Sequence, residues 1–163
     1  TGYTSRELLQ IRKEKKLSKG KDFYMVGGMG HASMVSLGIS LNSRKKIICL
    51  DGDGSILMHL GSLRTFGHLG NSNLKHILLN NNSHESVGGQ PTGAMGIDFK
   101  KLVKSIGYKN YFKISTTKEI SPALKKFLNS RGPSFLEVLI TMGTLDNLSR
   151  PIDLIKIKNF FMD

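Results

Sequence analysis

The sequence of 163 residues has a single cysteine, Cys49, which lies inside a short apolar run. One cysteine excludes a disulfide framework within the chain, and we expect Cys49 to be a small buried hydrophobe. No apolar stretch approaches the ~20 residues that a membrane-spanning helix needs. The N-terminus is polar and basic, unlike a secretory signal. These absences favour a folded cytoplasmic domain without a membrane-bound part.

Acidic residues are also scarce, since 12 Asp and Glu stand against 24 Lys and Arg, and the net charge is +12. A charge of this size is typical of some nucleic-acid-binding proteins. Here the basic residues are dispersed, no aromatic residues interleave them, and no nucleic-acid-binding motif appears. We therefore expect a lysine-rich solvated surface that favours anionic ligands, and we keep a nucleic-acid partner only as an alternative.

Internal repeats, low-complexity tracts and interdomain linkers are absent as well. A length of 163 residues with 39% apolar residues suits one domain with a substantial core. We expect a single domain over residues 1–163, in which the tail from 143 to 163 has the weakest periodicity.

What the sequence does contain is an alternation of strand-like apolar runs and helical patterns. Thr4 and Glu7 have the spacing of a capping box at the start of the first helix, with Leu8, Leu9 and Ile11 on its buried side. The alternation predicts an α/β fold, a parallel sheet with helices on both faces. The predicted strands are 23–26, 46–50, 76–79, 111–114 and 134–140, and the predicted helices are 4–17, 31–41, 56–69, 98–106 and 117–129.

Three clusters of polar residues and glycines each follow a predicted strand directly. They are the glycine cluster at 27–30, the Asp-Gly cluster at 51–55 and the asparagine cluster at 80–82. Ligands of parallel α/β sheets bind beyond the carboxyl ends of the strands. We therefore expect the three clusters to converge on one edge of the sheet.

The turn Gly52-Asp53-Gly54-Ser55 has the composition of a diphosphate-binding turn. Glycines allow a backbone to approach a phosphate closely, and the following helix points its amide groups at the anion. The carboxylate of Asp53 would repel a bare diphosphate, so a divalent cation is expected between them. Mg²⁺ takes one or two protein oxygens together with phosphate oxygens and water.

Asn81 is the second predicted metal ligand. It follows the next strand, 81 − 53 = 28 residues after Asp53, and one strand–helix–strand unit fills that interval. The two loops should therefore lie side by side, with the backbone carbonyl of Ser83 as a third ligand. Three asparagines stand in a row, and we choose Asn81 because Asn80 directly ends the apolar strand. A shift of the ligand to a neighbouring asparagine stays an alternative.

The Gly-Asp-Gly turn and the distant Asn-Asn pair together resemble the signature of thiamine-diphosphate-dependent enzymes. The resemblance implies that Asp53, Asn81 and Ser83 hold Mg²⁺ and that thiamine diphosphate is the cofactor. It also assigns the glycine cluster to the aminopyrimidine ring of the cofactor. There a backbone carbonyl at Gly28 accepts from the ring, the side chain of Met29 bends the cofactor, and Gly30 completes the contact.

Three further peptides, at residues 4–8, 54–63 and 84–90, are similar to those of the phosphonopyruvate decarboxylases, with the sulfopyruvate decarboxylases as their nearest relatives. This resemblance covers residues 1 to 150. It implies non-oxidative decarboxylation of an anionic 2-oxo acid such as 3-phosphonopyruvate, giving phosphonoacetaldehyde and CO₂. Sulfopyruvate decarboxylase, another thiamine-dependent lyase and a non-catalytic cofactor-binding subunit are the alternatives.

The resemblance also implies that half of the active site is supplied from elsewhere. In this family a glutamate on a separate pyrimidine-binding domain activates the cofactor, and none of the glutamates of this chain has that context. We therefore expect a pyrimidine-binding domain or subunit as a partner, a homo- or hetero-oligomer, and negligible activity of the isolated chain. The chain would be the C-terminal part of a longer enzyme or one subunit of a two-chain enzyme.

Among the five histidines, His84 is the candidate catalytic residue. It lies three residues after Asn81 in the predicted active-edge loop, where a side chain that titrates near neutrality could contact substrate or cofactor. His31, beside the glycine cluster, is a weaker candidate. The spacing of the histidines gives no zinc motif, and the remaining ones are expected to be structural or on the surface: His59, His68 and His76.

Overall fold

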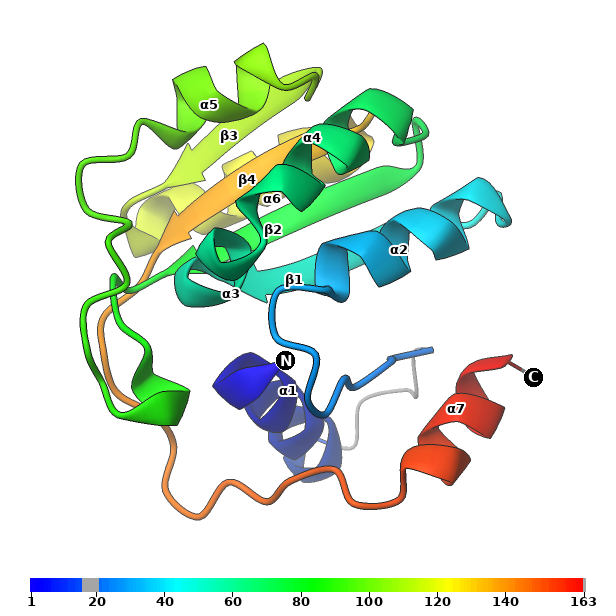
Figure 1. Ribbon diagram of the computed structural model, residues 1–163, viewed down its shortest axis with the longest axis vertical. Coiled ribbons are helices and arrows are strands. Elements are labelled where there is room, and N and C mark those ends of the chain that lie inside the picture. Colours follow the sequence, from blue (N-terminus) through cyan, green and yellow to red (C-terminus); the bar gives the residue numbers. More distant parts are fainter. Residues whose placement is uncertain (16–20, 163) are drawn as a thin grey trace.

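The computed structural model describes residues 1–15 and 21–162 and contains one sheet with helices on both of its faces (Figure 1). The α/β fold predicted from the sequence is therefore confirmed. The strands are Ile47–Gly52 (β1), Leu74–Asn80 (β2), Asn110–Ile114 (β3) and Ser134–Leu139 (β4). The helices are Gly2–Glu14 (α1), Ala32–Leu41 (α2), Asp53–Met58 (α3), Leu60–Leu69 (α4), Phe99–Ser105 (α5), Ile120–Asn129 (α6) and Leu154–Met162 (α7), with 3-10 turns at Glu85–Val87 (η1) and Thr117–Glu119 (η2).

The four strands are all parallel and lie in the order β1-β2-β4-β3. In the register of the sheet, Gly52 at the end of β1 pairs with Leu79, and Asn80 at the end of β2 pairs with Leu139 of β4. The carboxyl ends of three strands therefore reach the same edge. The loops that carry the Asp-Gly and asparagine clusters start there, side by side.

The sheet separates two apolar cores. The larger one lies beneath α2, α4 and α5 and contains fully buried aromatic rings, of which Phe66 comes from α4 and Phe135 from β4. The smaller one lies beneath α6, where Phe127 packs against Ile114 and Leu136. Burying a side chain of the size of Phe contributes roughly 2–3 kcal/mol, so these rings hold the helices to the sheet.

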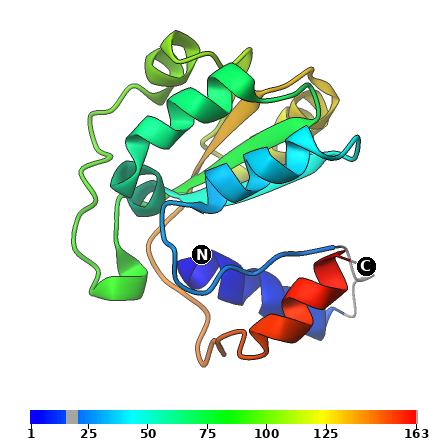
Figure 2. The same ribbon diagram turned by 45° about the vertical axis from the view of Figure 1, so that its right-hand side comes forward.

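The N-terminal helix, the segment 21–26 and the C-terminal helix form a separate layer next to the free edge of β1 (Figures 1 and 2). Phe23 of the segment packs against Phe161 of α7, with ring centroids 5.4 Å apart. A groove of about 400 Å³ separates this layer from β1. No helix within residues 1–15 and 21–162 is long and apolar enough to cross a membrane.

Several predictions for the N-terminal part were wrong. The segment 23–26 is not a strand, because the groove lies between it and β1 and none of the four described strands pairs with it. The capping box was also misplaced, since α1 already begins at Gly2 and Thr4 lies inside the helix. The helix ends at Glu14, and Leu17 lies outside the described residues.

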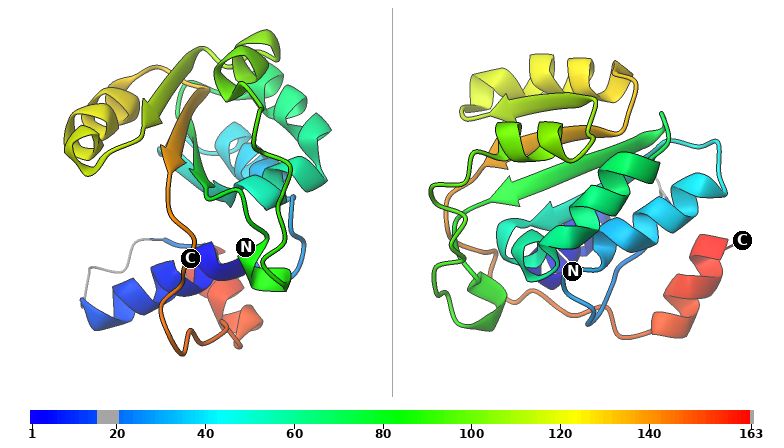
Figure 3. Two further views of the ribbon diagram at one scale, coloured as in Figure 1. Left: turned by 90° about the vertical axis from the view of Figure 1, so that its left-hand side faces the viewer. Right: turned by 45° about the horizontal axis from the view of Figure 1, so that its top comes forward.

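The predicted buried side of α1 was wrong as well. Ser5 is its buried residue, Leu8 and Leu9 are only half-buried, and Ile11 is exposed. The helix lies beside the sheet rather than on it, so its apolar residues face the groove in part (Figure 3). An apolar pattern predicts which face of a helix is buried only when another element covers that face.

Other predictions hold with changes at the boundaries. The single helix expected over 56–69 is two helices, α3 and α4, which meet at His59 with its φ of −135°. Asp98 caps α5 as expected, because its side chain accepts a hydrogen bond from the backbone of Lys101. Cys49 is buried, as predicted, and the tail, for which only weak periodicity was found, carries the helix α7.

Candidate functional site

A small cavity of about 100 Å³ lies at the carboxyl ends of β1 and β2. Its walls come from five parts of the chain: the start of α1, Met29 before α2, the turn after β1, the end of β2 with the loop after it, and the segment after β4. The predicted site residues in its lining are Met29, Gly52, Asp53, Gly54, Ser55, Asn81, Ser83 and His84. The structure thus brings together eight of the ten residues expected from the sequence, and leaves Gly28 and Gly30 outside the lining.

Asp53 is the most deeply buried acid of this cavity, with only 1% of its surface exposed. Its Oδ2 accepts a hydrogen bond of 2.5 Å from the hydroxyl of Thr92. No lysine or arginine among the described residues forms an ion pair with it. A buried carboxylate without a cation is costly, so this position is suited to an added positive ion.

Asn81 faces the same cavity, and its carboxamide is held in one orientation. The backbone N–H of Ser83 donates to Oδ1 at 3.1 Å, while Nδ2 donates to Glu85 at 2.5 Å. An amide oxygen accepts two hydrogen bonds or metal contacts, so Oδ1 keeps one lone pair free of these partners. Asn81 and the Asp53 carboxylate therefore offer oxygens to one small space.

The neighbouring asparagines, Asn80 and Asn82, make contacts outside the cavity. Asn80 is buried, and its side chain donates to the carboxylate of Glu137 on β4. Its Oδ1 accepts from the backbone of Asn82, which has a φ of 58° and turns the chain at this point. Neither residue lines the cavity. The geometry thus favours Asn81 over its neighbours, while metal binding itself stays a prediction.

His84 packs directly on the turn after β1. A Cβ added to Gly54 would overlap the imidazole ring of His84 and would lie 3.2 Å from Cγ2 of Thr92. A larger residue at position 54 would therefore displace the ring of His84, because the backbone and the ring approach closely. The candidate catalytic residue lies where the sequence predicted it, against the diphosphate-type turn.

The glycine cluster contacts the site through Gly30 and Met29. The backbone N–H of Gly30 donates to Oγ of Ser55 at 2.9 Å, and a φ of 89° makes glycine necessary there. Met29 lines the cavity, whereas Gly28 is exposed and its carbonyl accepts from the backbone of His31 at 3.0 Å. Only Met29 of the three is placed to touch a molecule in this cavity.

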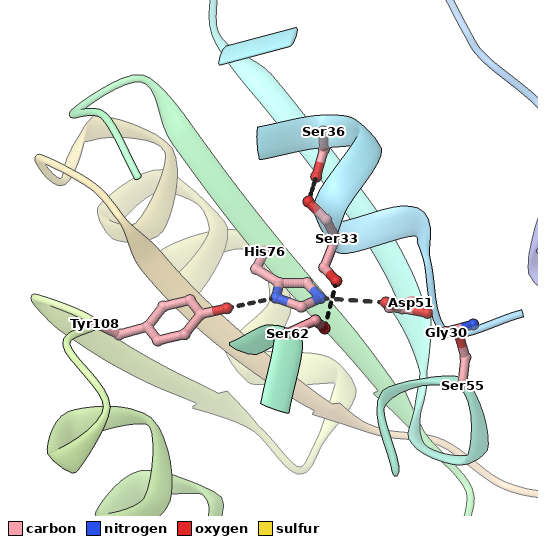
Figure 4. A network of polar contacts seen from close by, with 8 residues as sticks. All are labelled: Gly30, Ser33, Ser36, Asp51, Ser55, Ser62, His76 and Tyr108. Carbon is pink, nitrogen blue, oxygen red and sulfur yellow. Dashed lines mark hydrogen bonds and ion pairs between the residues drawn. The ribbon is translucent and has the colours of Figure 1, made fainter. Parts of the chain in front are cut away.

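A chain of polar contacts from Tyr108 through His76 to Asp51 crosses the core (Figure 4). Nδ1 of His76 and the hydroxyl of Tyr108 share a hydrogen bond of 2.8 Å. On the other side of the ring, Nε2 of His76 lies 3.5 Å from Oδ2 of Asp51. Burial by itself would lower the pKa of His76. The neighbouring Cys49 and Asp51 outweigh burial and raise this pKa to about 9.

This contact chain places the buried Asp51 beside His76. The ligand atoms of Cys49, Asp51 and His76 all lie within 4.8 Å of one another, and all three residues are buried. A protonated His76 would neutralise the carboxylate, and Asp51 would then add no second charge next to the turn that carries Asp53. The histidine spacing in the sequence gave no sign of this cluster.

The remaining histidines lie where a structural or surface role was expected. His59 and His68 are exposed. The ring centroids of His59 and His31 are 4.2 Å apart. The same His59 ring occupies the place that a side chain at Gly30 would need. None of these three rings lines the cavity.

Two polar residues that hold the predicted ligands were not predicted from the sequence. Thr92 bonds to Asp53 over 39 residues, and Glu85 bonds to Asn81 within one loop. Thr92 gave no signal, since a lone threonine in a Gly-rich loop has no periodicity. Glu85 was visible in the peptide at 84–90, but only its three-dimensional contacts reveal what it does.

Comparison with known proteins identifies this cavity with a family. A family model described as the C-terminal TPP binding domain of thiamine pyrophosphate enzymes matches residues 1–138. The match includes the turn after β1, the loop after β2 and nearly all of β4. It covers every residue that lines the cavity except the segment after β4.

Two kinds of curated relatives match most of the chain. The phosphonopyruvate decarboxylase of Streptomyces viridochromogenes is 38% identical over 151 residues, which is 93% of this chain and 37% of that protein. The sulfopyruvate decarboxylase subunit beta of Methanothermobacter thermautotrophicus is 37% identical over 145 residues, 89% of this chain and 73% of that subunit. The chain thus spans little more than a third of the first relative and about three quarters of the second.

A solved structure supports the fold alone. It is described as a putative thiamin diphosphate-dependent enzyme isolated from Mycobacterium smegmatis. It is 20% identical, with a TM-score of 0.56, and the match covers 71% of this chain and 23% of that chain. The parallel sheet with its flanking helices is therefore an arrangement already seen in an experimental structure.

Proposed function

The chain belongs to the thiamine pyrophosphate enzymes as their C-terminal TPP-binding domain, and from this premise we propose that it binds thiamine diphosphate through Mg²⁺. Asp53, Asn81 and the carbonyl of Ser83 are the proposed protein ligands of the metal. Gly52, Gly54 and Ser55 are the proposed neighbours of the diphosphate, and Met29 the apolar contact of the cofactor.

The observation that carries this proposal is the buried carboxylate of Asp53, which shares one cavity with Asn81 and Ser83 and has no lysine or arginine partner among the described residues. A hard divalent cation prefers carboxylate and carbonyl oxygens and completes its shell with phosphate oxygens. Such a cation would neutralise Asp53 and attract the diphosphate at the same place.

The proposed reaction is the non-oxidative decarboxylation of a 2-oxo acid, with 3-phosphonopyruvate as the substrate and phosphonoacetaldehyde as the product. When bound, thiamine diphosphate supplies the carbon nucleophile and the electron sink for the departure of CO₂. The residues of this chain anchor and orient the cofactor. His84 lies against the turn at Gly54, from where its imidazole can hold or donate a proton near the substrate.

We propose further that a pyrimidine-binding domain or subunit completes the active site. The relatives named as beta subunits support a partner chain, and the short match to the phosphonopyruvate decarboxylase supports a second domain. No glutamate of this chain is assigned to cofactor activation, so the isolated chain should have negligible turnover. A cytoplasmic location and an oligomeric assembly also stay predictions.

Sulfopyruvate is the second candidate substrate, because the beta-subunit relative is 37% identical, almost as similar as the phosphonopyruvate decarboxylase. Both substrates carry an anionic group beside a 2-oxo acid, so they share the chemistry that this site would recognise. A panel of the two substrates with the complete enzyme, comparing kcat/KM, separates them.

The cofactor proposal is tested by calorimetric titration of the chain with thiamine diphosphate, with and without Mg²⁺. We expect binding that depends on the metal, and we expect Asp53→Ala to lose the metal-dependent part. Thermal unfolding of the variant checks that it is folded. Equal affinity of the wild-type chain and Asp53→Ala in Mg²⁺ would contradict the proposed site.

A further inference from the structure

Glu85 joins two segments of the chain at the mouth of the cavity. Its Oε2 accepts from Nδ2 of Asn81 at 2.5 Å, and its Oε1 accepts from the backbone N–H of Gly143 at 2.5 Å. Asn81 follows β2, whereas Gly143 follows β4, and 58 residues separate Glu85 from Gly143. One carboxylate therefore links the loop after β2 to the segment after β4.

The orientation of the Asn81 carboxamide depends on this link. The backbone N–H of Ser83 can only donate, so it must face Oδ1, and a carboxylate can only accept, so Glu85 must face Nδ2. The hydrogen bonds from Ser83 and to Glu85 therefore fix the Asn81 carboxamide in the same orientation. If Glu85 released Nδ2, the amide would keep a single 3.1 Å contact to Ser83 and could rotate.

The link also holds the wall of the cavity opposite the Asp-Gly turn. Ile140, Gly143 and Thr144 line the cavity, and the backbone N–H of Ile140 donates to the carbonyl of Asn80. Beyond Ile140, Gly143 is exposed and adopts a φ of 122°, so the Glu85 carboxylate fixes a segment with little other support.

We propose that Glu85 is a positioning residue that turns the carboxamide oxygen of Asn81 toward the cation and ties the segment after β4 across the site. The inference rests on the proposed magnesium site and adds a residue to it. Metal affinity and the position of the segment 140–144 are then coupled through one side chain.

A glutamine cannot replace this carboxylate, although its shape is nearly the same. Both partners of Glu85 are N–H donors, while a glutamine side chain has one acceptor oxygen and an amino group that only donates. In Glu85→Gln, one of the two N–H groups would face another N–H group. The variant therefore removes one link and the charge without leaving a void.

The experiment measures Mn²⁺ binding to the chain in the presence of thiamine diphosphate, by electron paramagnetic resonance of the free ion. Charge-assisted hydrogen bonds are the stronger class, so we expect Glu85→Gln to weaken Mn²⁺ binding roughly tenfold. Thermal unfolding of Glu85→Gln should stay unchanged within a degree or two. In Glu85→Ala, which removes both acceptor oxygens, the exchange of the Gly143 amide proton, followed by NMR without cofactor, should become roughly tenfold faster.

The matched control is Glu7→Gln. Glu7 also lines the cavity, and it does not contact Asn81 or Gly143 through a hydrogen bond in the structure. This variant removes the same charge beside the metal and measures the contribution of charge alone, which we expect to be about twofold at an open site. Equal losses in the two variants would show a charge effect and overturn the positioning role.

Two other outcomes distinguish a failure of the Glu85 inference from a failure of the proposed function. Unchanged Mn²⁺ affinity in Glu85→Gln, or unchanged exchange at Gly143 in Glu85→Ala, overturns the inference even if the cofactor binds. A wild-type chain that binds no Mn²⁺ with thiamine diphosphate contradicts the proposed function instead, and the exchange of the Gly143 amide still tests the link without any cofactor.

Discussion

The hydroxyl of Thr92 donates a 2.5 Å hydrogen bond to Oδ2 of Asp53, a residue 39 positions earlier in the chain. The same Thr92 oxygen accepts from the backbone N–H of Ala94 at 3.2 Å. The loop after β2 therefore folds back over the turn after β1, and a neutral donor fixes the carboxylate that would meet the cation.

This contact predicts the effect of Thr92→Val, which has nearly the same shape and no hydroxyl. Without the donor, the carboxylate of Asp53 can rotate, and we expect Mg²⁺-dependent binding of thiamine diphosphate to weaken roughly fivefold to tenfold. Calorimetric titration measures this change. Thr92→Ser should restore most of the affinity, and Thr117→Val, at an exposed position, should have no effect. Wild-type affinity in Thr92→Val would contradict a role of this bond.

Asp53→Asn should separate binding from stability. The variant keeps an oxygen for Thr92 and removes a buried charge that has no cation partner among the described residues. We expect the Tm of the cofactor-free chain to rise by a few degrees while metal-dependent binding is lost. Thermal unfolding with and without Mg²⁺ and thiamine diphosphate measures both effects. A fall in Tm without cofactor would mean that the carboxylate stabilises the fold.

Gly54→Ala tests the close approach of His84. The added Cβ would overlap the imidazole ring, so the ring must move away from the turn. We expect cofactor binding to fall at least tenfold, because the diphosphate-type turn and the ring are displaced together. The control is Gly61→Ala, where a Cβ meets nothing within 4 Å and where alanine favours the helix α4. That control should bind normally and unfold at an equal or higher temperature.

Protonation of His76 predicts how stability depends on pH. The pKa of His76 is raised to about 9 in the folded chain, above the ordinary value of about 6.5. Its contribution to stability is therefore fully present below pH ~6.5 and is lost as the pH rises through about 9. We expect the Tm to fall across this range.

The protonation of the His76 ring can also be followed directly by NMR. The Cε1 proton of His76 should show no titration in NMR between pH 5 and 8. If His76 titrated near pH 6.5 in the folded chain, the ion pair with Asp51 would not hold.

Much of the fold could be predicted because alternating apolar runs are local features of the sequence. The strands β1 to β4 and the helices above them lie close to the predicted ranges, since each buries an apolar face against its neighbours. The segment 23–26 has the same apolar character and is not a strand. A strand is a pairing of two backbones, and the segment lies across a groove from β1.

The candidate site, like the fold, could be predicted from the sequence only in part. The spacing of 28 residues between Asp53 and Asn81 predicted that their loops meet, because parallel strands joined by one crossover end at one edge of the sheet. Among the three asparagines, Asn81 was chosen because Asn80 directly ends the apolar strand. The structure favours the same residue, since Asn81 lines the cavity while the side chain of Asn80 donates to Glu137. Gly28 was placed at the cofactor by resemblance and lies outside the cavity.

The sequence by itself determined the layered α/β architecture, the loops that carry the proposed oxygen ligands and the glycines that let these loops approach each other. These follow from periodicity and backbone freedom, which depend on neighbouring residues. Tertiary structure decided which side chains hold those ligands: Thr92 on Asp53, Glu85 on Asn81 and His76 beside Asp51. Such partners lie on different loops and strands, so only the folded chain brings their donors and acceptors within hydrogen-bonding or ion-pair distance.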